Sequence, residues 1–280
     1  MNMNALSANG QAQARRAANS KAVDMGARAG FVARGVIYLL VGVLAARIAF
    51  AGGSGKQADR GGAIAEIAEQ PFGKVLLWAL GIALVGMALW RLSEALFGQA
   101  GPDGRDASKR AVAAGRFVFY GFVAYSVLSY AVGVQGSGSG SSDRRTADVT
   151  AKALGWTGGQ WIVGIAGVVV VGAGLWIAFR AIARKYHKHL KTAEMTRRTR
   201  QAVDVVGVFG GAVRGAVFAT AGGFAVAAAV QHEPGKAKGM DDTLRSFTQT
   251  PVGPWLLVLV AVGLAAFGLF SWANARYRKV

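Results

Sequence analysis

The sequence predicts an all-α, polytopic membrane protein: six transmembrane helices built as three parallel two-helix repeats around a pseudo-threefold axis. Composition is the first observation, because 53% of the residues are hydrophobic and 16% are charged, whereas a soluble domain carries about 25% charged residues. Six long apolar segments and a recurring pattern along the chain are the other two. The 280 residues include no cysteine, which excludes disulfide frameworks and cysteine-ligated metals.

Six segments are long and apolar enough to cross a bilayer, whose hydrocarbon core of about 30 Å requires about 20 apolar residues in a helix. They are residues 31–50, 75–97, 117–134, 159–181, 205–230 and 255–273. None alternates polar and apolar residues, so helices are expected. A cleaved signal peptide is an alternative for the first segment, since Ala49-Phe50-Ala51 offers small residues at cleavage spacing. The polar stretch before Phe31 is long for a leader, however.

Lysines and arginines concentrate in the N-terminal tail, the second and fourth loops and the C-terminus, with roughly twice as many there as in the other three loops. Basic residues beside transmembrane segments are retained on the cytoplasmic side. We therefore expect both termini in the cytoplasm, and we attribute most of the net charge of +18 to topology.

The chain contains three copies of one sequence unit. A shift of 180 residues places Arg34-Gly35 on Arg214-Gly215, Pro71 on Pro251 and Trp90 on Phe270. The middle copy fits with a shift of 82 residues in its first helix and 86 in its second. The predicted organisation is a flexible cytoplasmic tail at 1–27, repeat 1 at 28–100, repeat 2 at 107–185, a basic cytoplasmic linker at 186–203 and repeat 3 at 204–280.

Each outer loop contains a short segment with apolar residues three positions apart, at 63–69, 149–154 and 243–248. We expect short interfacial helices there, each ended by a turn such as Pro71-Phe72-Gly73. The middle copy has Thr157-Gly158-Gly159 in place of the proline turn. Its outer loop is therefore expected to be arranged differently.

The R-G-x-x-Y/F opening, the P-F-G or P-V-G-P turn and the second helix ending in Trp recur over almost the whole chain, from about residue 28 to 276. In these motifs the sequence resembles the bacterial six-helix membrane proteins grouped as the domain of unknown function 1206 family. The resemblance implies a multi-pass protein of the bacterial plasma membrane. The resemblance implies no biochemical activity for any residue of this sequence.

The candidate site consists of one arginine per repeat, each four residues before an aromatic residue: Arg34 with Tyr38, Arg116 with Tyr120, and Arg214 with Phe218. One helical turn would place each guanidinium beside its own ring. Threefold symmetry would bring the three arginines into a ring near the cytoplasmic face. Such a ring suits an anionic headgroup or solute. The alternative, which we favour from the sequence, is that each arginine reaches out to lipid phosphates and anchors its helix.

Other polar residues have simpler interpretations. Glu94 is interpreted as the surface partner of Arg91, three residues earlier. His187 and His189 are interpreted as part of a solvated basic loop rather than as metal ligands, and no cofactor is expected. Glycine pairs are interpreted as sites of close helix packing. These are Gly81, Gly86, Gly167, Gly172, Gly211 and Gly215.

No catalytic motif is recognisable, so the leading hypothesis is a non-enzymatic protein that organises the membrane or assists a partner complex. A transporter or channel, or a lipid-binding protein that takes an anionic ligand at the arginine ring, is the alternative. A lipid-modifying enzyme is the weakest of the three hypotheses. The expected partner is the bilayer itself, with a preference for anionic lipids on the cytoplasmic side. A protein partner stays open, and nucleic acid is not expected.

Overall fold

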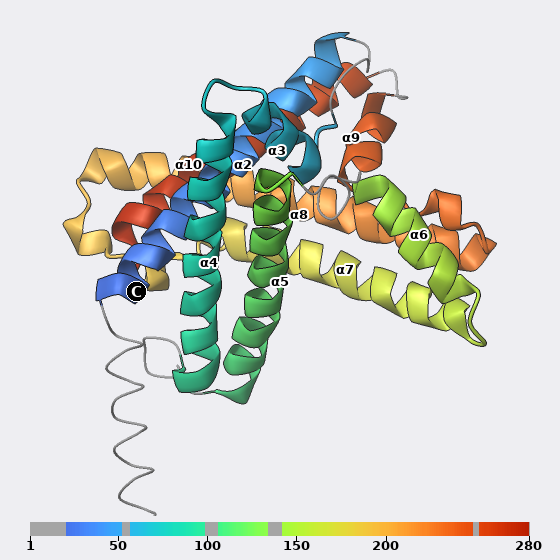
Figure 1. Cartoon of the computed structure of the whole chain (residues 1–280), viewed down its shortest axis with the longest axis horizontal. Helices are drawn as coiled ribbons and strands as arrows, with labels where there is room; N and C mark the ends of the chain where they lie inside the picture. The colour runs from blue at the N-terminus through green and yellow to red at the C-terminus, as the bar shows by residue number, and fades with distance from the viewer. Residues whose placement is uncertain (1–20, 52–56, 99–105, 134–141, 249–251, 280) are drawn as a thin grey trace, which may run out of the picture.

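The computed structural model of the chain describes residues 21–51, 57–98, 106–133, 142–248 and 252–279 (Figure 1). Six long helices dominate it: α2 (Lys21–Ala51), α4 (Gly73–Phe97), α5 (Ala107–Ala131), α7 (Gly159–Ile182), α8 (Arg197–Gln231) and α10 (Gly253–Tyr277). Three short helices lie between them: α3 (Arg60–Ala68), α6 (Ser142–Leu154) and α9 (Met240–Thr248). Single 3-10 turns occupy His187–His189, Thr192–Glu194 and Pro234–Lys236.

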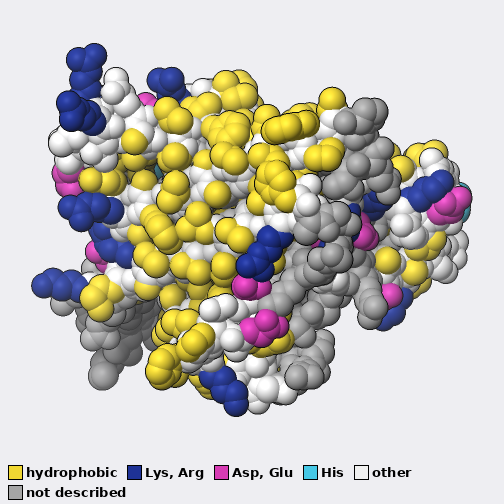
Figure 2. Space-filling view, turned by 90° about the horizontal axis from the view of Figure 1, so that it is seen from above, with side chains coloured by type: hydrophobic (Ala, Val, Ile, Leu, Met, Phe, Trp, Pro, Cys, Tyr) yellow, Lys and Arg dark blue, Asp and Glu magenta, His cyan; other side chains and the backbone are white. Residues whose placement is uncertain are grey.

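All six long helices are long and apolar enough to cross a membrane. Much of their apolar surface is exposed, as expected where lipid is the solvent. Seen from above, the molecule presents a broad hydrophobic area with basic side chains gathered toward its left end (Figure 2). Two helices begin earlier than the sequence predicted, because residues 21–27 and 197–203 are helical rather than tail and linker. The rest of the predicted tail, residues 1–20, lies outside the described part.

The closest helix pairs join different repeats: α2 with α10, α4 with α5, and α7 with α8. Within repeats, α2 also packs on α4 and α8 on α10, whereas α5 and α7 of the middle repeat are not among the closely packed pairs. The α4–α5 pair and the α7–α8 pair run in clearly different directions (Figure 1). The chain is thus all-α with three tandem repeats, but it is not a closed threefold ring, and the pseudo-threefold axis stays a prediction.

Small residues permit close approach at two of the inter-repeat contacts, and they do so at equivalent positions. A Cβ on Gly42 of α2 would lie 2.8 Å from the carbonyl oxygen of Ala261 in α10. A Cβ on Gly222 of α8 would lie 2.8 Å from the carbonyl oxygen of Gly167 in α7. Gly222 lies 180 positions after Gly42. Ala261 and Gly167 both correspond to Gly81 of repeat 1, at shifts of 180 and 86 residues. In a membrane, where lipid is as apolar as the helices, such backbone contacts are a main source of helix association.

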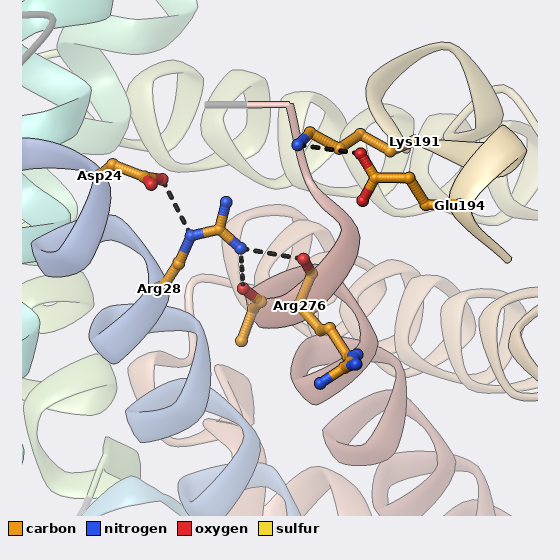
Figure 3. A network of polar contacts seen from close by, with 6 residues as sticks. Asp24, Arg28, Lys191, Glu194 and Arg276 are labelled. Atoms are coloured by element: carbon orange, nitrogen blue, oxygen red, sulfur yellow. Dashed lines mark hydrogen bonds and ion pairs between the residues drawn. The ribbon is translucent and has the colours of Figure 1, made fainter. Parts of the chain in front are cut away.

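Arginines cap helix ends at two inter-repeat contacts. Arg28 of α2 donates from Nη1 to the carbonyl oxygens of Ala275 and Arg276, at 2.8 and 2.9 Å (Figure 3). Arg110 of α5 donates in the same way to two residues of α4, at 2.8 and 3.2 Å. The acceptors in α4, Ala95 and Leu96, are the repeat equivalents of Ala275 and Arg276. Each arginine supplies hydrogen bonds that the last turn of its neighbour lacks. At the α7–α8 contact, the equivalent position is occupied by valine.

The predicted short outer helices are present. In α3, the side chain of Asp59 accepts a hydrogen bond from Gly62 N at 2.8 Å and caps the helix. Asp241 of α9 accepts from Ala58 N at 2.7 Å and so connects α9 to the start of α3. The apolar residues Ile64 and Leu244 are buried within the protein. They pack on the bundle rather than facing lipid, which departs from a purely interfacial arrangement.

The outer loop of the middle copy differs as expected, because α6 spans 13 residues where α3 and α9 span nine each. The turn that follows it is nevertheless alike in the first two copies. Phe72 precedes α4 with φ 63°, and its equivalent Gly158 precedes α7 with φ 78°, so both turns enter the helix through a left-handed residue. Glycine adopts this conformation without steric cost, which makes the proline turn dispensable. It is the third copy that departs, because Val252 before α10 has φ −97°.

Candidate anion-binding site

Six arginines lie within electrostatic range of one another or of Tyr120, in the half of the bundle that contains the start of α2 and the end of α10. One comes from each of the six long helices, with the last just beyond the end of α10. We call these residues the arginine cluster: Arg34, Arg91, Arg116, Arg180, Arg214 and Arg278.

Arg34 of α2 is held between two other repeats. Its Nε donates to Ser271 Oγ at 2.5 Å, and its Nη1 donates to the hydroxyl of Tyr120 at 3.3 Å. The guanidinium also lies over the rings of Phe31 and Phe267, 4.8 and 5.3 Å from their centroids. Arg34 therefore connects helices α5 and α10 to α2 and is fixed by aromatic faces.

Arg214 of α8 repeats this arrangement one repeat further on. Its Nε donates to the hydroxyl of Tyr38 at 2.8 Å, and its guanidinium lies 4.7 Å from the centroid of Phe267. The arginine of repeat 3 thus donates a hydrogen bond to the tyrosine of repeat 1, and the arginine of repeat 1 donates one to the tyrosine of repeat 2. The corresponding residue of repeat 3 is Phe218, which has no hydroxyl to accept a hydrogen bond from repeat 2.

Arg91 and Glu94 form an ion pair with Nη1 and Oε2 2.5 Å apart. The sequence predicted this pair correctly but placed it on the surface, and that placement is wrong: Arg91 is 3% exposed and Glu94 is 7% exposed. The pair is buried because these residues point into the arginine cluster. Arg91 also lies over the Trp90 ring, 4.0 Å from its centroid, yet its Nε has no hydrogen-bond partner among the described residues.

Arg278 joins the cluster from just beyond the end of α10. Its guanidinium lies over Phe31 and Trp90, 5.2 and 5.1 Å from their centroids. Burial and then the charge of Arg91 lower the pKa of Arg278 to about 9. Its buried Nε, like that of Arg91, lacks a hydrogen-bond partner within the described chain. Two guanidinium groups therefore retain unused donors in the same place.

Arg116 and Arg180 face the cluster from the two helices that do not pack together. Both are half-buried, and Arg116 experiences the charges of Arg91, Glu94 and Arg180. For the part of the chain that the structure describes, neither side chain forms a hydrogen bond or an ion pair. The cluster thus contains six guanidinium groups around one carboxylate, Glu94. Such a surplus of half-buried positive charge attracts an anion, and planar guanidinium forks match the oxygens of phosphate or carboxylate.

The structure brings four of the predicted site residues into direct contact and places the fifth beside them. Arg34 contacts Tyr120, and Arg214 contacts Tyr38, while Arg116 lies within electrostatic range of Tyr120. The expected stacking of each arginine on the aromatic residue four positions later is found, among the described residues, for Arg214 alone, 5.1 Å from the Phe218 centroid. Arg34 lies instead over Phe31, three positions earlier in α2. Neighbouring repeats come close enough to supply the partners instead.

Sequence reasoning missed Arg91, Arg180 and Arg278 as members of the site. One signal was available for Arg180: at the shift of 86 residues, it replaces Glu94 of repeat 1. Arg91 and Arg278 have no such signal, since an arginine at the end of an apolar helix is what topology alone requires.

Five of the six predicted packing glycines lie at helix contacts. Gly86 faces Gly26 of α2, and Gly215 faces the carbonyl oxygen of Gly174, where a Cβ would lie only 2.5 Å away. The other three face Leu128, Gly222 and Ala181; they are Gly81, Gly167 and Gly211. Gly172 departs from the prediction, because no heavy atom lies within 4 Å of a Cβ placed there. Val168, Leu175 and Trp176 on the same face of α7 are exposed as well, as far as the described residues show.

The fourth loop packs against the C-terminus at Leu190, while its basic residues Arg184, Lys185 and Lys188 stay exposed. His187 and His189 are half-buried, so they are less solvated than expected. Leu190 is 1% exposed and forms a single antiparallel bridge with Arg278. His187 Nε2 contacts Asp204, to which Tyr186 also donates a hydrogen bond at 3.0 Å. Burial, and then the bond to Asp204, raises the pKa of Tyr186 above its ordinary value.

Burial, followed by the charges of Arg278 and Lys188, lowers the pKa of His189 to about 4. His189 is therefore neutral at pH 7. Among the described residues, no group of three His, Asp or Glu side chains is placed to hold a metal ion.

Comparison with known proteins agrees with this architecture. The family described as Domain of Unknown Function (DUF1206) matches three successive stretches, residues 29–98, 111–184 and 209–278. A Bacillus subtilis (strain 168) protein, named as uncharacterized protein YxxB, is 27% identical over 258 residues, which cover 90% of both chains. No solved structure matches the chain. With three copies of the family's unit in tandem, this six-helix protein belongs to the DUF1206 family.

Proposed function

We propose that this protein is a non-enzymatic, multi-pass protein of the bacterial plasma membrane that binds the headgroup of anionic phospholipids in the arginine cluster. The single observation that carries the proposal is the arginine cluster itself, in which Arg91, Arg116 and Arg278 share one carboxylate, Glu94. The protein would act by holding lipid, and so by organising the membrane around it or around a partner complex.

The chemistry of the cluster supports binding rather than turnover. Its side chains are guanidinium groups fixed by tyrosine hydroxyls and aromatic faces, as at Arg34 and Arg214. Such groups remain charged at every physiological pH and therefore hold an anion without exchanging protons. Catalysis of acyl or phosphoryl transfer would require a nucleophile beside a general base, which is a different arrangement.

The location of the cluster supports a lipid as the anion. The cluster lies in the half of the bundle that contains the start of α2 and the end of α10, and the distribution of basic residues predicts that this side faces the cytoplasm. Anionic phospholipids give the cytoplasmic leaflet its negative surface potential, and each basic residue near the surface contributes about 1 kcal/mol toward binding them.

Native mass spectrometry of the purified full-length protein tests the proposal. After exchange into mixtures of phosphatidylglycerol and phosphatidylcholine, we expect the protein to retain phosphatidylglycerol preferentially. The double variant R34Q/R214Q should lose most of that preference, because it removes two positioned guanidinium groups. R198Q is the matched control, since Arg198 is an exposed residue near the start of α8, outside the cluster. Equal retention of both lipids, or an equal loss in R198Q, would overturn the proposal.

A further inference from the structure

The three repeats differ at one position that faces the arginine cluster. Each repeat has an arginine in its first helix, Arg34, Arg116 or Arg214. The equivalent positions in the second helices hold Glu94, Arg180 and Asn274. Repeat 1 therefore combines an arginine with an acid, repeat 3 combines an arginine with an amide, and repeat 2 combines two arginines.

Helix packing separates repeat 2 from repeats 1 and 3 in the same way. In repeats 1 and 3 the two helices pack together, α2 on α4 and α8 on α10. In repeat 2 they do not, since α5 packs mainly on α4 and α7 mainly on α8. Two like charges repel strongly where the surroundings are poorly polarisable. The arginine that replaces an acid in α7 thus places a second positive charge near Arg116, in the one repeat whose two helices do not pack together.

Within the described residues neither Arg116 nor Arg180 forms an ion pair, although Arg116 experiences the charge of Glu94. Arg116 and Arg180 lie within electrostatic range of each other and are half-buried. The one carboxylate nearby, Glu94, is already paired with Arg91. An anion placed between the two guanidinium groups would supply the negative charge that Glu94 supplies within repeat 1.

Phosphate chemistry suits this position better than a carboxylate. The arginines approach from two different helices, so the ligand must offer oxygens on two sides. The oxygens of a phosphate are arranged tetrahedrally around phosphorus and offer acceptors in several directions, whereas the two oxygens of a carboxylate and their lone pairs lie in one plane. Arginine forks bind such oxygens in pairs.

We propose that a phosphate group binds between Arg116 and Arg180 and that its charge draws the ends of α5 and α7 together, completing the middle repeat. The inference rests on the proposed function and names the place within the arginine cluster where the headgroup phosphate is held. The ligand class is a phosphate oxyanion, carried by a phospholipid or free in solution.

Distances between spin labels test the inference, and the absence of native cysteine makes labelling selective. Cysteines introduced as A114C in α5 and A183C just after α7 replace exposed alanines near the two arginines. Pulsed electron paramagnetic resonance would be measured in nanodiscs of phosphatidylcholine alone, with added phosphatidylglycerol, and with added inorganic phosphate. We expect the distance to shorten with the anion. Shortening by phosphatidylglycerol alone identifies the lipid as the source, and shortening by inorganic phosphate identifies a free anion.

Two substitutions of the same residue make the test decisive. R180E restores the acid of repeat 1, so its label distance should be short without any anion. R180Q removes the charge without supplying an acid, so its distance should no longer respond to anions. R198Q should behave as the parent. A response that survives in R180Q, or an R180E distance that stays long in protein that remains monodisperse, would overturn the inference.

The two proposals can fail separately. Selective retention of phosphatidylglycerol with no change in label distance leaves the proposed function standing and removes the site between Arg116 and Arg180. If the label distance responds to inorganic phosphate but the protein shows no lipid preference, the site between Arg116 and Arg180 stands and the proposed lipid-binding function fails.

Discussion

The Nε of Arg214 donates a hydrogen bond to the Tyr38 hydroxyl, 2.8 Å away, and thereby joins the third repeat to the first. The two residues are 176 positions apart in the chain. We expect Y38F to lower the free energy of unfolding by about 1–3 kcal/mol, since it removes the acceptor of a charged donor. Thermal unfolding in detergent would measure this. Y125F is the control: its side chain is exposed on α5, so a similar loss there would contradict the role assigned to Tyr38.

Glycine substitutions separate true helix contacts from open surface. G215A places a methyl group 2.5 Å from the carbonyl oxygen of Gly174 and should destabilise the protein by about 1–3 kcal/mol through overpacking. G172A adds the same methyl group where nothing lies within 4 Å. It should be neutral or slightly stabilising, because alanine is the better helix former. Comparable melting temperatures for the two variants would refute the α7–α8 contact described here.

Acidification should loosen the folded loop between α7 and α8. The pKa of His189 is lowered to about 4 from an ordinary value of 6.5. Between these values the unfolded chain binds a proton that the folded loop does not. Stability is therefore fully present above about pH 6.5 and falls as the pH decreases toward 4. Hydrogen exchange of residues 185–194 should speed up between pH 7 and pH 5, after correction for intrinsic rates. H189Q should remove that pH dependence, and a variant that keeps it would disprove the assignment.

Membrane orientation can be tested with single cysteines, again because the chain has none of its own. K188C lies in the loop packed against the C-terminus, and K236C lies in the 3-10 turn after α8, at the other end of the bundle. Basic residues retained in the cytoplasm predict that a membrane-impermeant maleimide labels K236C in intact cells and K188C only after lysis. The opposite pattern would place both termini outside.

Several features of this fold follow directly from the order of residues. The length and apolarity of each segment are enough to predict a transmembrane helix, and matching residues at a shift of 180 are enough to predict repetition. The pair Arg91 and Glu94 was also predictable, because residues three apart on a helix lie on one face. Its burial was not, since the sequence shows which side chains share a face but not what that face meets.

Which helices pack together could be decided only in three dimensions. Lipid-facing and helix-facing surfaces are equally apolar in a membrane protein, so no hydrophobic pattern distinguishes Gly172, which meets nothing, from Gly167, which meets α8. For the same reason the sequence by itself determined six helices, three repeats and one arginine in the first helix of each repeat, but assigned each arginine to its own ring. Tertiary packing placed the Tyr120 hydroxyl beside Arg34 and left Arg116 within electrostatic range of Arg180, with no ion pair to either among the described residues, because contacts between repeats depend on how closely backbones approach.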